Sequence, residues 1–419
     1  MRFIHAADLH IDSPLRGLDR YEGAPVERIR SATRKAFIAL VDQALERSVD
    51  LVLLAGDVFD GDWPDLNTGL FFSGQLARLD REGIRVFIVH GNHDAQSVVT
   101  RRFPLPKNTT EFSSEAAQTV QIDALGVAIH GRSFPNRAVD EDLVPEYPAP
   151  VPGMFNIGML HTSLNGRAGH DTYAPTTLEI LKRKGYDYWA LGHVHAREVL
   201  SDAPRIIYPG NVQGRHANET GPKGCEVVTV TGTSVQGEFV ALDVVRWHHL
   251  RVSIEGVDDL ETVAQLMRNA FATVVNEAPE HLHAVRVTLT GVCRVYEVEA
   301  RTPGRLAATI QSEALAIGEA QVWVEQVRVE LLAPVDREAV ALRDDAVGEL
   351  VRLVDSMSAE PAVLRKWVDE YLQALRIALP GSVDIDSLPD ADDHEALRVL
   401  LLEAEATVLA NLASGTDTQ

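Results

Sequence analysis

Short apolar runs alternate with amphipathic segments along the first part of the chain. Apolar runs at 3–8, 50–57 and 84–92 predict buried strands. Between them, apolar residues recur at three- and four-residue steps, which predicts helices over 25–48 and around 65–82. The order strand, helix, strand, helix, strand indicates parallel pairing in a layered α/β fold.

Six further apolar runs predict strands downstream, at 126–131, 155–161, 186–193, 205–211, 224–230 and 238–245. Turn residues separate the later runs, and no helical period connects them. We therefore expect this late cluster to be antiparallel.

The pattern changes near residue 246. Strands are expected at 248–254, 284–291, 293–300 and 322–331, with helices over 258–276 and 303–318. This order is typical of a small α+β domain of the split βαβ type. From residue 336 the chain reads as helical, with segments at 336–356, 361–378 and 390–413 before a polar tail. We expect three parts, at 1–245, 246–335 and 336–419.

Composition is that of an ordinary globular protein, because 45% of the 419 residues are hydrophobic and 24% are charged. Cys225 and Cys293 stand far apart with no second cysteine or histidine beside them, which argues against a disulfide framework or a thiolate zinc site and fits a reducing cytosol. Neither a signal-peptide pattern nor an apolar run of about 18 residues is present. We expect a cytoplasmic protein without a membrane span.

The formal net charge of −22 counts against a simple nucleic-acid binder, which would present a basic face. A nuclease is still compatible with this charge, because bound divalent cations offset carboxylates locally and a partner subunit can supply basic surface.

Five short polar segments each follow an apolar run. Ligands collect outside the carboxyl ends of strands in open α/β sheets, so these segments can converge although they span almost 190 positions. The candidate chemistry lies in Asp8 and His10, Asp57 and Asp60, Asn92 with His93 and Asp94, His161, and His193 with His195.

The residue types favour a centre with two divalent metals. In Asp8-x-His10 and His193-x-His195 the two ligands are two positions apart, so in an extended segment they point the same way. Carboxylate, imidazole and amide oxygen suit manganese, iron, zinc or magnesium. The carboxylate of Asp57 can bridge two ions, and two metals about 3.5–4 Å apart can clamp both oxygens of an in-line displacement at phosphorus. Glycines before Asp57, Asn92 and His193 permit sharp turns close to the site.

Other residues have candidate roles in catalysis. His93 adjoins a ligand and is assigned to protonate the leaving oxygen or to stabilise the transition state, with Asp94 orienting its imidazole. Asp60 and Asp94 can equally be helix-cap or turn residues. Arg215 and His216 can contact a substrate phosphate. The alternative is a glycine-rich surface loop held by an Arg215–Glu219 pair.

Together, the five segments resemble the calcineurin-like metallophosphoesterase superfamily over residues 1–245. AADLHIDSPL, LAGDVFD and GNHD look like the SbcD-type DNA-repair exonucleases, and RHANETGPKG is similar to their YhaO subgroup. The resemblance implies a four-layer β-sandwich flanked by helices, a catalytic role for His93, and manganese as the usual metal. It assigns Asp8, His10, Asp57 and His195 to one ion, and Asp57, Asn92, His161 and His193 to the other.

The resemblance also implies partners. Residues 246–335 would cap the phosphoesterase domain and shape a DNA groove, and the C-terminal helices would dock on the coiled coil of an SMC-like ATPase of the SbcC type. Members usually form a homodimer through helices of the phosphoesterase domain. No role transfers to Asp60, because animal relatives carry histidine there. The GDxxDRG form of protein phosphatases is absent, since Gly61 and Asp62 follow Asp60.

Three functions compete. The leading hypothesis is a manganese-dependent DNA exonuclease and endonuclease working with an SMC-like ATPase. A small-molecule phosphoesterase acting on cyclic nucleotides or phosphomonoesters would fit the acidic charge, but would not need about 170 additional residues. A non-catalytic assembly subunit would have no need of a full ligand set.

Overall fold

The computed structural model describes most of the chain: residues 1–13, 24–60, 66–96, 104–164, 173–318, 321–332, 334, 336–360, 362–368 and 393–415. It divides into two compact units. Unit 1 comprises Met1–His249, Thr273–Arg286 and Ile317–Glu325, and unit 2 comprises Leu250–Ala272, Val287–Ala316 and Gln326–Gln419.

Two six-stranded sheets form the centre of unit 1. The first has the order β12-β11-β1-β2-β3-β4 and the second the order β5-β6-β7-β8-β10-β9. The first comprises β1 (Arg2–Ala6), β2 (Leu51–Ala55), β3 (Arg85–Val89), β4 (Thr109–Glu111), β11 (Gly224–Thr231) and β12 (Ser234–Ala241). The second comprises β5 (Gln118–Ile122), β6 (Val127–Gly131), β7 (Phe155–His161), β8 (Tyr188–Gly192), β9 (Glu198–Asp202) and β10 (Arg205–Tyr208).

The sheets face each other across a shared apolar core. Because successive side chains of a strand point to opposite faces, Phe3, Leu51 and Leu53 of the first sheet meet Ile129 and Ile157 of the second. All five side chains are fully buried or nearly so. This packing explains why β2 is apolar throughout rather than alternating, since both of its faces are covered.

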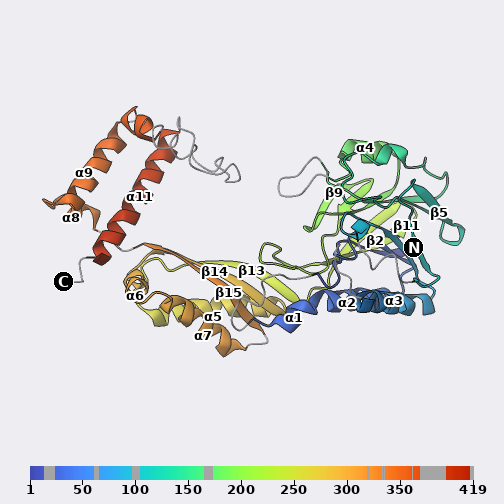
Figure 1. The fold of residues 1–419 in the computed structure, drawn as a ribbon, viewed down its shortest axis with the longest axis horizontal. Coiled ribbons are helices and arrows are strands. Elements are labelled where there is room, and N and C mark those ends of the chain that lie inside the picture. Colours follow the sequence, from blue (N-terminus) through green and yellow to red (C-terminus); the bar gives the residue numbers. More distant parts are fainter. Residues whose placement is uncertain are drawn as a thin grey trace. The chain divides into compact units, whose positions relative to one another are not determined.

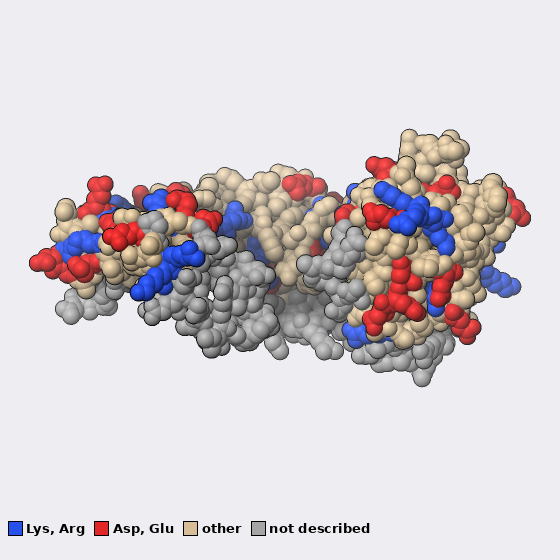
Figure 2. Space-filling model, turned by 90° about the horizontal axis from the view of Figure 1, so that it is seen from above, with Lys and Arg blue, Asp and Glu red and all other residues tan. Residues whose placement is uncertain are grey.

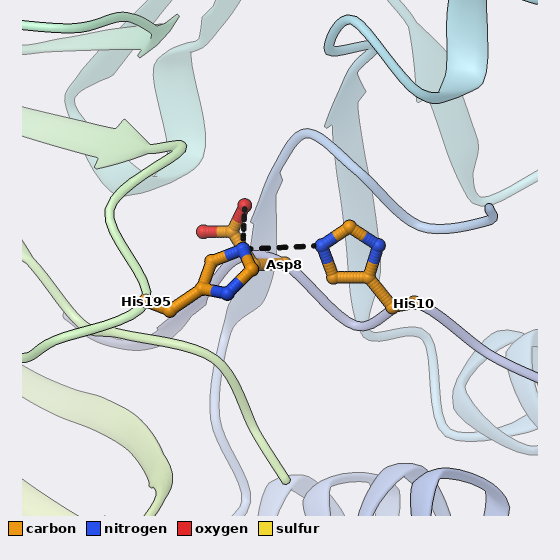
Figure 3. A group of neighbouring side chains, drawn as sticks. All are labelled: Asp8, His10 and His195. Carbon is orange, nitrogen blue, oxygen red and sulfur yellow. Dashed lines mark hydrogen bonds and ion pairs between the residues drawn. The ribbon is translucent and has the colours of Figure 1, made fainter. Parts of the chain in front are cut away.

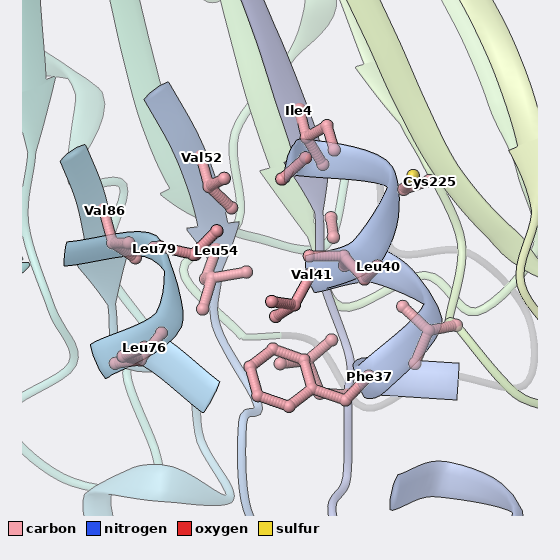
Figure 4. Close-up of a cluster of buried hydrophobic side chains, with 14 of the residues drawn as sticks. Ile4, Phe37, Leu40, Val41, Val52, Leu54, Leu76, Leu79, Val86 and Cys225 are labelled. Carbon is pink, nitrogen blue, oxygen red and sulfur yellow. The ribbon is translucent and has the colours of Figure 1, made fainter. Parts of the chain in front are cut away.

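Helices cover the outer face of the first sheet. α2 (Ala32–Glu46) and α3 (Leu66–Arg81) place Phe37, Leu40 and Leu76 against Val52 and Leu54 of β2, as Figure 4 shows. Two shorter helices are α1 (Val26–Arg30) and α4 (Leu178–Arg183). Of these, α4 lies over the second sheet (Figure 1). The predicted α/β class, with two sheets flanked by helices, is confirmed.

Strand directions differ in part from expectation. β1, β2 and β3 are parallel, as predicted, and β4, which the sequence did not predict, is parallel to β3. β6, β7, β8 and β10 are parallel as well. The antiparallel pairs are β5/β6, β9/β10, β1/β11 and β11/β12. Turn residues between the later runs therefore mark longer connections as well as hairpins, so they did not determine strand direction.

A third sheet contains β13 (Val245–Ser253), β14 (Leu282–Val292) and β15 (Val322–Leu332), adjacent in that order. Because β13 and β14 are neighbours, the arrangement is not the predicted split βαβ type. α5 (Leu260–Glu277) connects these two strands. The strand expected at 293–300 is instead the helix α6 (Val295–Arg301), which precedes α7 (Arg305–Ile317).

The end of unit 2 is helical, with α8 (Arg337–Ala341), α9 (Ala346–Ala359), a helical stretch at 362–368 and α11 (His394–Gly415). Met357, Leu364, Val368 and Leu397 form a small buried cluster among them. Residues 361, 369–392 and 416–419, which carry parts of the predicted helices and the tail, lie outside the described residues. Within the described part of the chain, no helix is long and apolar enough to cross a membrane.

Candidate metal centre

The candidate ligands lie at strand ends of both large sheets. β1, β2 and β3 end at Ala6, Ala55 and Val89, shortly before Asp8, Asp57 and Asn92. In the second sheet β7 ends on His161 and β8 ends at Gly192, directly before His193. The site therefore lies at the carboxyl ends of parallel strands, where the sequence pattern placed it.

Four of these ligands have a left-handed backbone. The φ angles are 52° at Asp8, 42° at His10, 51° at Asp57 and 102° at His193. Such a φ is uncommon outside glycine and costs on the order of 1–3 kcal/mol per residue. The expectation of extended Asp-x-His and His-x-His segments is therefore wrong, because the chain turns at the ligands themselves. Backbone strain concentrated on ligand residues is typical of a functional site.

Asp8, His10 and His195 form one group of neighbouring side chains (Figure 3). His195 Nε2 lies 3.8 Å from Asp8 Oδ1 and 3.3 Å from His10 Nε2. The carboxylate of Asp8 also accepts the backbone N–H of His193 at 3.0 Å, which ties the β1 loop to the β8 loop. These atoms are close enough to share one cation.

Asp57, Asn92 and His161 lie beside the first group. His161 Nε2 is 3.1 Å from Asn92 Oδ1 and 3.3 Å from Asp57 Oδ2. The same Asp57 oxygen lies 3.9 Å from His10 Nε2, so Asp57 stands between the two groups, as a bridging ligand would. The ring of His193 is 5.2 Å from that of His161, centroid to centroid. The structure thus brings together all seven residues predicted to hold metal.

The outer nitrogen of three ligand histidines faces an oxygen. His10 Nδ1 lies 3.2 Å from Asp60, His195 Nδ1 lies 2.6 Å from Glu219, and His161 Nδ1 lies 3.0 Å from the carbonyl of Ala55. Each oxygen is an acceptor, so Nδ1 carries the proton and Nε2 presents a lone pair to the site. His10 and His195 then direct two lone pairs at each other across 3.3 Å. A cation between them resolves this repulsion, so the donor set fits divalent metal.

The ionisation of Asp57 suits a metal ligand, whereas His161 must release a proton before its Nε2 can bind a metal. Burial raises the pKa of Asp57, but the charges of His161 and His10 outweigh it and hold that pKa well below its usual range. Burial lowers the pKa of His10, and the charge of Arg215 lowers it further. For His161 burial also acts to lower the pKa, but the Asp57 charge dominates and raises it to about 9. Asp57 is therefore ionised, as a ligand must be.

Two glycines make room for the ligands. A Cβ on Gly91 would lie 2.3 Å from Asp57 Oδ1 and 2.8 Å from His161 Nε2. A Cβ on Gly192 would lie 1.8 Å from the carbonyl oxygen of Ala55. The close approach predicted from the glycines before Asn92 and His193 is present, because no larger residue fits at either position.

His93 borders the site, and its side chain is 33% exposed, so a substrate can reach it. Its Nδ1 lies 2.8 Å from Asp60 Oδ1. Burial lowers the pKa of His93, but the hydrogen bond to Asp60 and the nearby carboxylate charges raise it above its ordinary value. In the structure, therefore, Asp60 rather than Asp94 contacts the imidazole of His93 and can orient it.

Asp94 instead accepts hydrogen bonds from the backbone. Its fully buried carboxylate accepts the N–H groups of Val58, Phe59 and Gly91 at 2.8–3.2 Å. These bonds tie the loop after β2 to the loop after β3. The carboxylate is already used by three donors, which explains why it does not orient the imidazole of His93.

Arg215 and His216 lie beside the site. Arg215 donates to Asp60 Oδ2 at 3.2 Å, and its side chain is 15% exposed. His216 is 58% exposed and lies 3.4 Å from Glu219. The Arg215–Glu219 contact of the structural alternative is present, at 3.8 Å, and contact of Arg215 and His216 with a substrate phosphate stays a prediction. The contact of Glu219 with His195 was missed, because no fixed spacing connects a metal ligand to a carboxylate in a later loop.

Comparison with known proteins agrees with this chemistry. A family model of calcineurin-like phosphoesterases matches residues 1–197, and a model of the middle domain of metallophosphoesterase YhaO matches residues 247–332. The chain is 36% identical over 304 residues to the metallophosphoesterase YhaO of Bacillus subtilis, covering 72% of this chain and 74% of that protein.

More distant similarity extends to two archaeal proteins, each named DNA double-strand break repair protein Mre11. The chain is 27% identical over 234 residues to that of Methanopyrus kandleri, covering 50% of this chain and 48% of the relative. It is 23% identical over 413 residues to that of Methanosarcina mazei, covering 92% of this chain and 61% of the relative. The chain thus spans less than two thirds of either Mre11 protein. The match to YhaO covers most of both chains, and the chain belongs to the YhaO family of calcineurin-like metallophosphoesterases.

Proposed function

We propose that the chain is a manganese-dependent nuclease that hydrolyses phosphodiester bonds in DNA during repair, as exonuclease and endonuclease. The observation that carries the proposal is the convergence of seven candidate ligands at the ends of two sheets, with the His93–Asp60 pair beside them. Carboxylate, imidazole and amide oxygen are a donor set for manganese and related ions.

We assign Asp8, His10, Asp57 and His195 to one ion, and Asp57, Asn92, His161 and His193 to the other. When bound, two such ions neutralise charge on the phosphate oxygens and make water a nucleophile near neutral pH. The Nδ1 contacts described above hold three of the histidines in the tautomer that ligation requires.

The proton for the leaving oxygen comes from His93. Asp60 accepts the Nδ1 proton of His93, so the ring is held in one orientation and Nε2 is the nitrogen that meets the substrate. Arg215 contacts the other carboxylate oxygen of Asp60, and its side chain is 15% exposed. The exposed part of its guanidinium would donate to a phosphate oxygen.

DNA is supported as the substrate by the relatives. Two of them are named as DNA double-strand break repair proteins, and the similarity to that of Methanosarcina mazei extends over 92% of this chain, well beyond the phosphoesterase match. Apolar side chains are also exposed on the C-terminal helices, including Leu353 (53%), Trp367 (44%) and Val408 (45%). These suit an SMC-like ATPase subunit as partner. Leu66 and Leu70 are similarly exposed on α3 and suit a homodimer.

A small-molecule phosphoesterase is the second candidate, and the charge of the chain favours it. The net charge is −22, and Figure 2 shows Lys and Arg in small groups beside Asp and Glu on the described part of the face it presents. A small phosphodiester needs less basic surface than a duplex.

The test is cleavage of an end-labelled oligonucleotide with Mn²⁺, with and without the ATPase partner. Wild type is compared with His93→Ala and with His249→Ala, a matched control at an exposed position of β13. Metal content is measured on all three proteins. We expect His93→Ala to retain its metal and lose cleavage by at least a hundredfold, and His249→Ala to behave as wild type.

The outcomes separate the two candidates. Intact DNA in the presence of wild-type protein, two bound metals and the partner would contradict the nuclease. Turnover of a cyclic nucleotide or a phosphomonoester by the same preparation would then establish the second candidate.

A further inference from the structure

Glu219 lies where three hydrogen-bond donors meet, although it belongs to none of the five sequence motifs. One carboxylate oxygen lies 2.6 Å from His195 Nδ1. The other accepts the backbone N–H of Arg215 at 2.6 Å and the side-chain amide of Asn211 at 3.0 Å. Glu219 is only 8% exposed, whereas the neighbouring His216 side chain is 58% exposed.

These contacts place Arg215 between the two histidine ligands of one metal group. Its backbone is held by Glu219, which also binds His195, and its guanidinium donates to Asp60, which also binds His10. A displacement of either histidine is therefore transmitted to Arg215 through one carboxylate. We name residues 209–219, which run from the end of β10 to Glu219, the arm.

We propose that Glu219 is a positioning residue that couples metal binding at His195 to the placement of Arg215 in the substrate site. The substrate role of Arg215 rests on the proposed function, whereas the coupling of the arm to metal binding does not. A bound metal fixes the His195 ring, the ring fixes Glu219 through its Nδ1 proton, and Glu219 fixes the arm through Arg215 and Asn211.

A purely structural role makes a different prediction. The Glu219 carboxylate also holds the arm together, since it accepts the backbone N–H of Arg215 and the side-chain amide of Asn211. If it did only that, a change at Glu219 would alter the stability of the arm equally with and without metal, and the affinity for metal would be unchanged.

The substitution Glu219→Gln distinguishes these roles. An ionised carboxylate offers two acceptor oxygens to the three donors, whereas an amide offers one oxygen and turns its NH₂ group toward a donor. The control is Glu238→Gln, the same chemical change on β12, where the Glu238 side chain pairs with Arg47 and is 60% exposed.

The first readout is calorimetric titration of the chelator-stripped full chain with Mn²⁺ alone. We expect the affinity for one of the two ions to fall about tenfold in Glu219→Gln, with the other ion and Glu238→Gln as in wild type. Affinities within twofold of wild type for both ions would overturn the link between Glu219 and His195.

The second readout is amide hydrogen exchange over 209–219, with and without saturating Mn²⁺. Mn²⁺ should slow exchange in wild type and in Glu238→Gln, and have no effect on the arm in Glu219→Gln. Slowing of equal size in all three proteins would overturn the coupling. Both readouts need no substrate, so an inactive wild type would refute the proposed function without affecting this test.

The third readout, which depends on the proposed function, is turnover of bis(p-nitrophenyl) phosphate at saturating Mn²⁺. If Glu219 acts through Arg215, the loss of kcat/KM in the double variant Arg215→Ala/Glu219→Gln equals that in Arg215→Ala alone. Additive losses would show that Glu219 does not act through Arg215, and would overturn that part of the proposal.

Discussion

Some side chains in this site orient the residues that contact them. Asp60 illustrates this, because one carboxylate contacts the candidate ligand His10, the candidate acid His93 and the guanidinium of Arg215. Ser13 donates to the same group. An aspartate with so many partners orients the residues around it, so its loss should affect the rate more than substrate binding.

We expect Asp60→Asn to lower kcat by about 10–100-fold with a smaller change in KM, because an amide has one acceptor oxygen and cannot serve both the histidines at Oδ1 and the Arg215 and Ser13 donors at Oδ2. Steady-state kinetics on a phosphodiester would measure both constants. Asp202→Asn provides the control, because the Asp202 side chain is 87% exposed and pairs with Arg205. A larger effect on KM than on kcat would contradict the orienting role.

Loops at strand ends determine the geometry of the site. Candidate ligands follow β1, β2, β3 and β8 within four residues, and several have a left-handed φ. Parallel strands bring these loops to one edge, and the absence of a Cβ at Gly91 lets the loops after β2 and β3 approach His161. The loops are therefore sensitive to even one additional carbon atom.

Two glycine substitutions should have opposite effects. Gly91→Ala puts a Cβ 2.3 Å from Asp57 Oδ1, so we expect loss of bound metal and at least a hundredfold loss of activity. Gly74→Ala on α3 meets no atom within 4 Å and should stabilise the protein by about 0.5–1 kcal/mol through helix propensity. Metal analysis and chemical denaturation measure the two effects. Wild-type metal content in Gly91→Ala would refute the first prediction.

At the scale of the whole molecule, the site requires both large sheets. Asp8, Asp57 and Asn92 follow strands of the first sheet, and His161 and His193 follow strands of the second. Neither sheet contains the full donor set, so metal at this site would link the two sheets. Two buried carboxylates and facing imidazole lone pairs also repel when no cation lies between them.

Removal of metal should therefore destabilise the protein. We expect chelator-treated protein to unfold at a lower temperature than the Mn²⁺-bound form, and Mn²⁺ at a hundred times its Kd to restore about 2.7 kcal/mol per site. Thermal unfolding with chelator, and after Mn²⁺ is added back, measures this. An unfolding temperature that does not respond to Mn²⁺ would contradict the presence of metal between the sheets.

The sequence alone determined the buried strands, the amphipathic helices α2 and α3, and the segments whose polar residues converge. These follow from local rules, since apolar periodicity and the residues directly after a strand are read within about ten positions. The sequence also predicted close approach of the backbone at the glycines before Asn92 and His193, because the absence of a side chain there can be seen in the local sequence.

Only the tertiary structure decided which residues support those ligands. Asp60 rather than Asp94 faces His93, and Glu219 faces His195 across 24 positions of sequence, because contacts between loops depend on how the sheets bring them together. The parallel course of β8 and β10 and the helical state of α6 were decided in the same way, since pairing and packing outweigh local propensity in short segments. The local sequence therefore identifies the candidate ligands, whereas the folded chain determines which residues orient them.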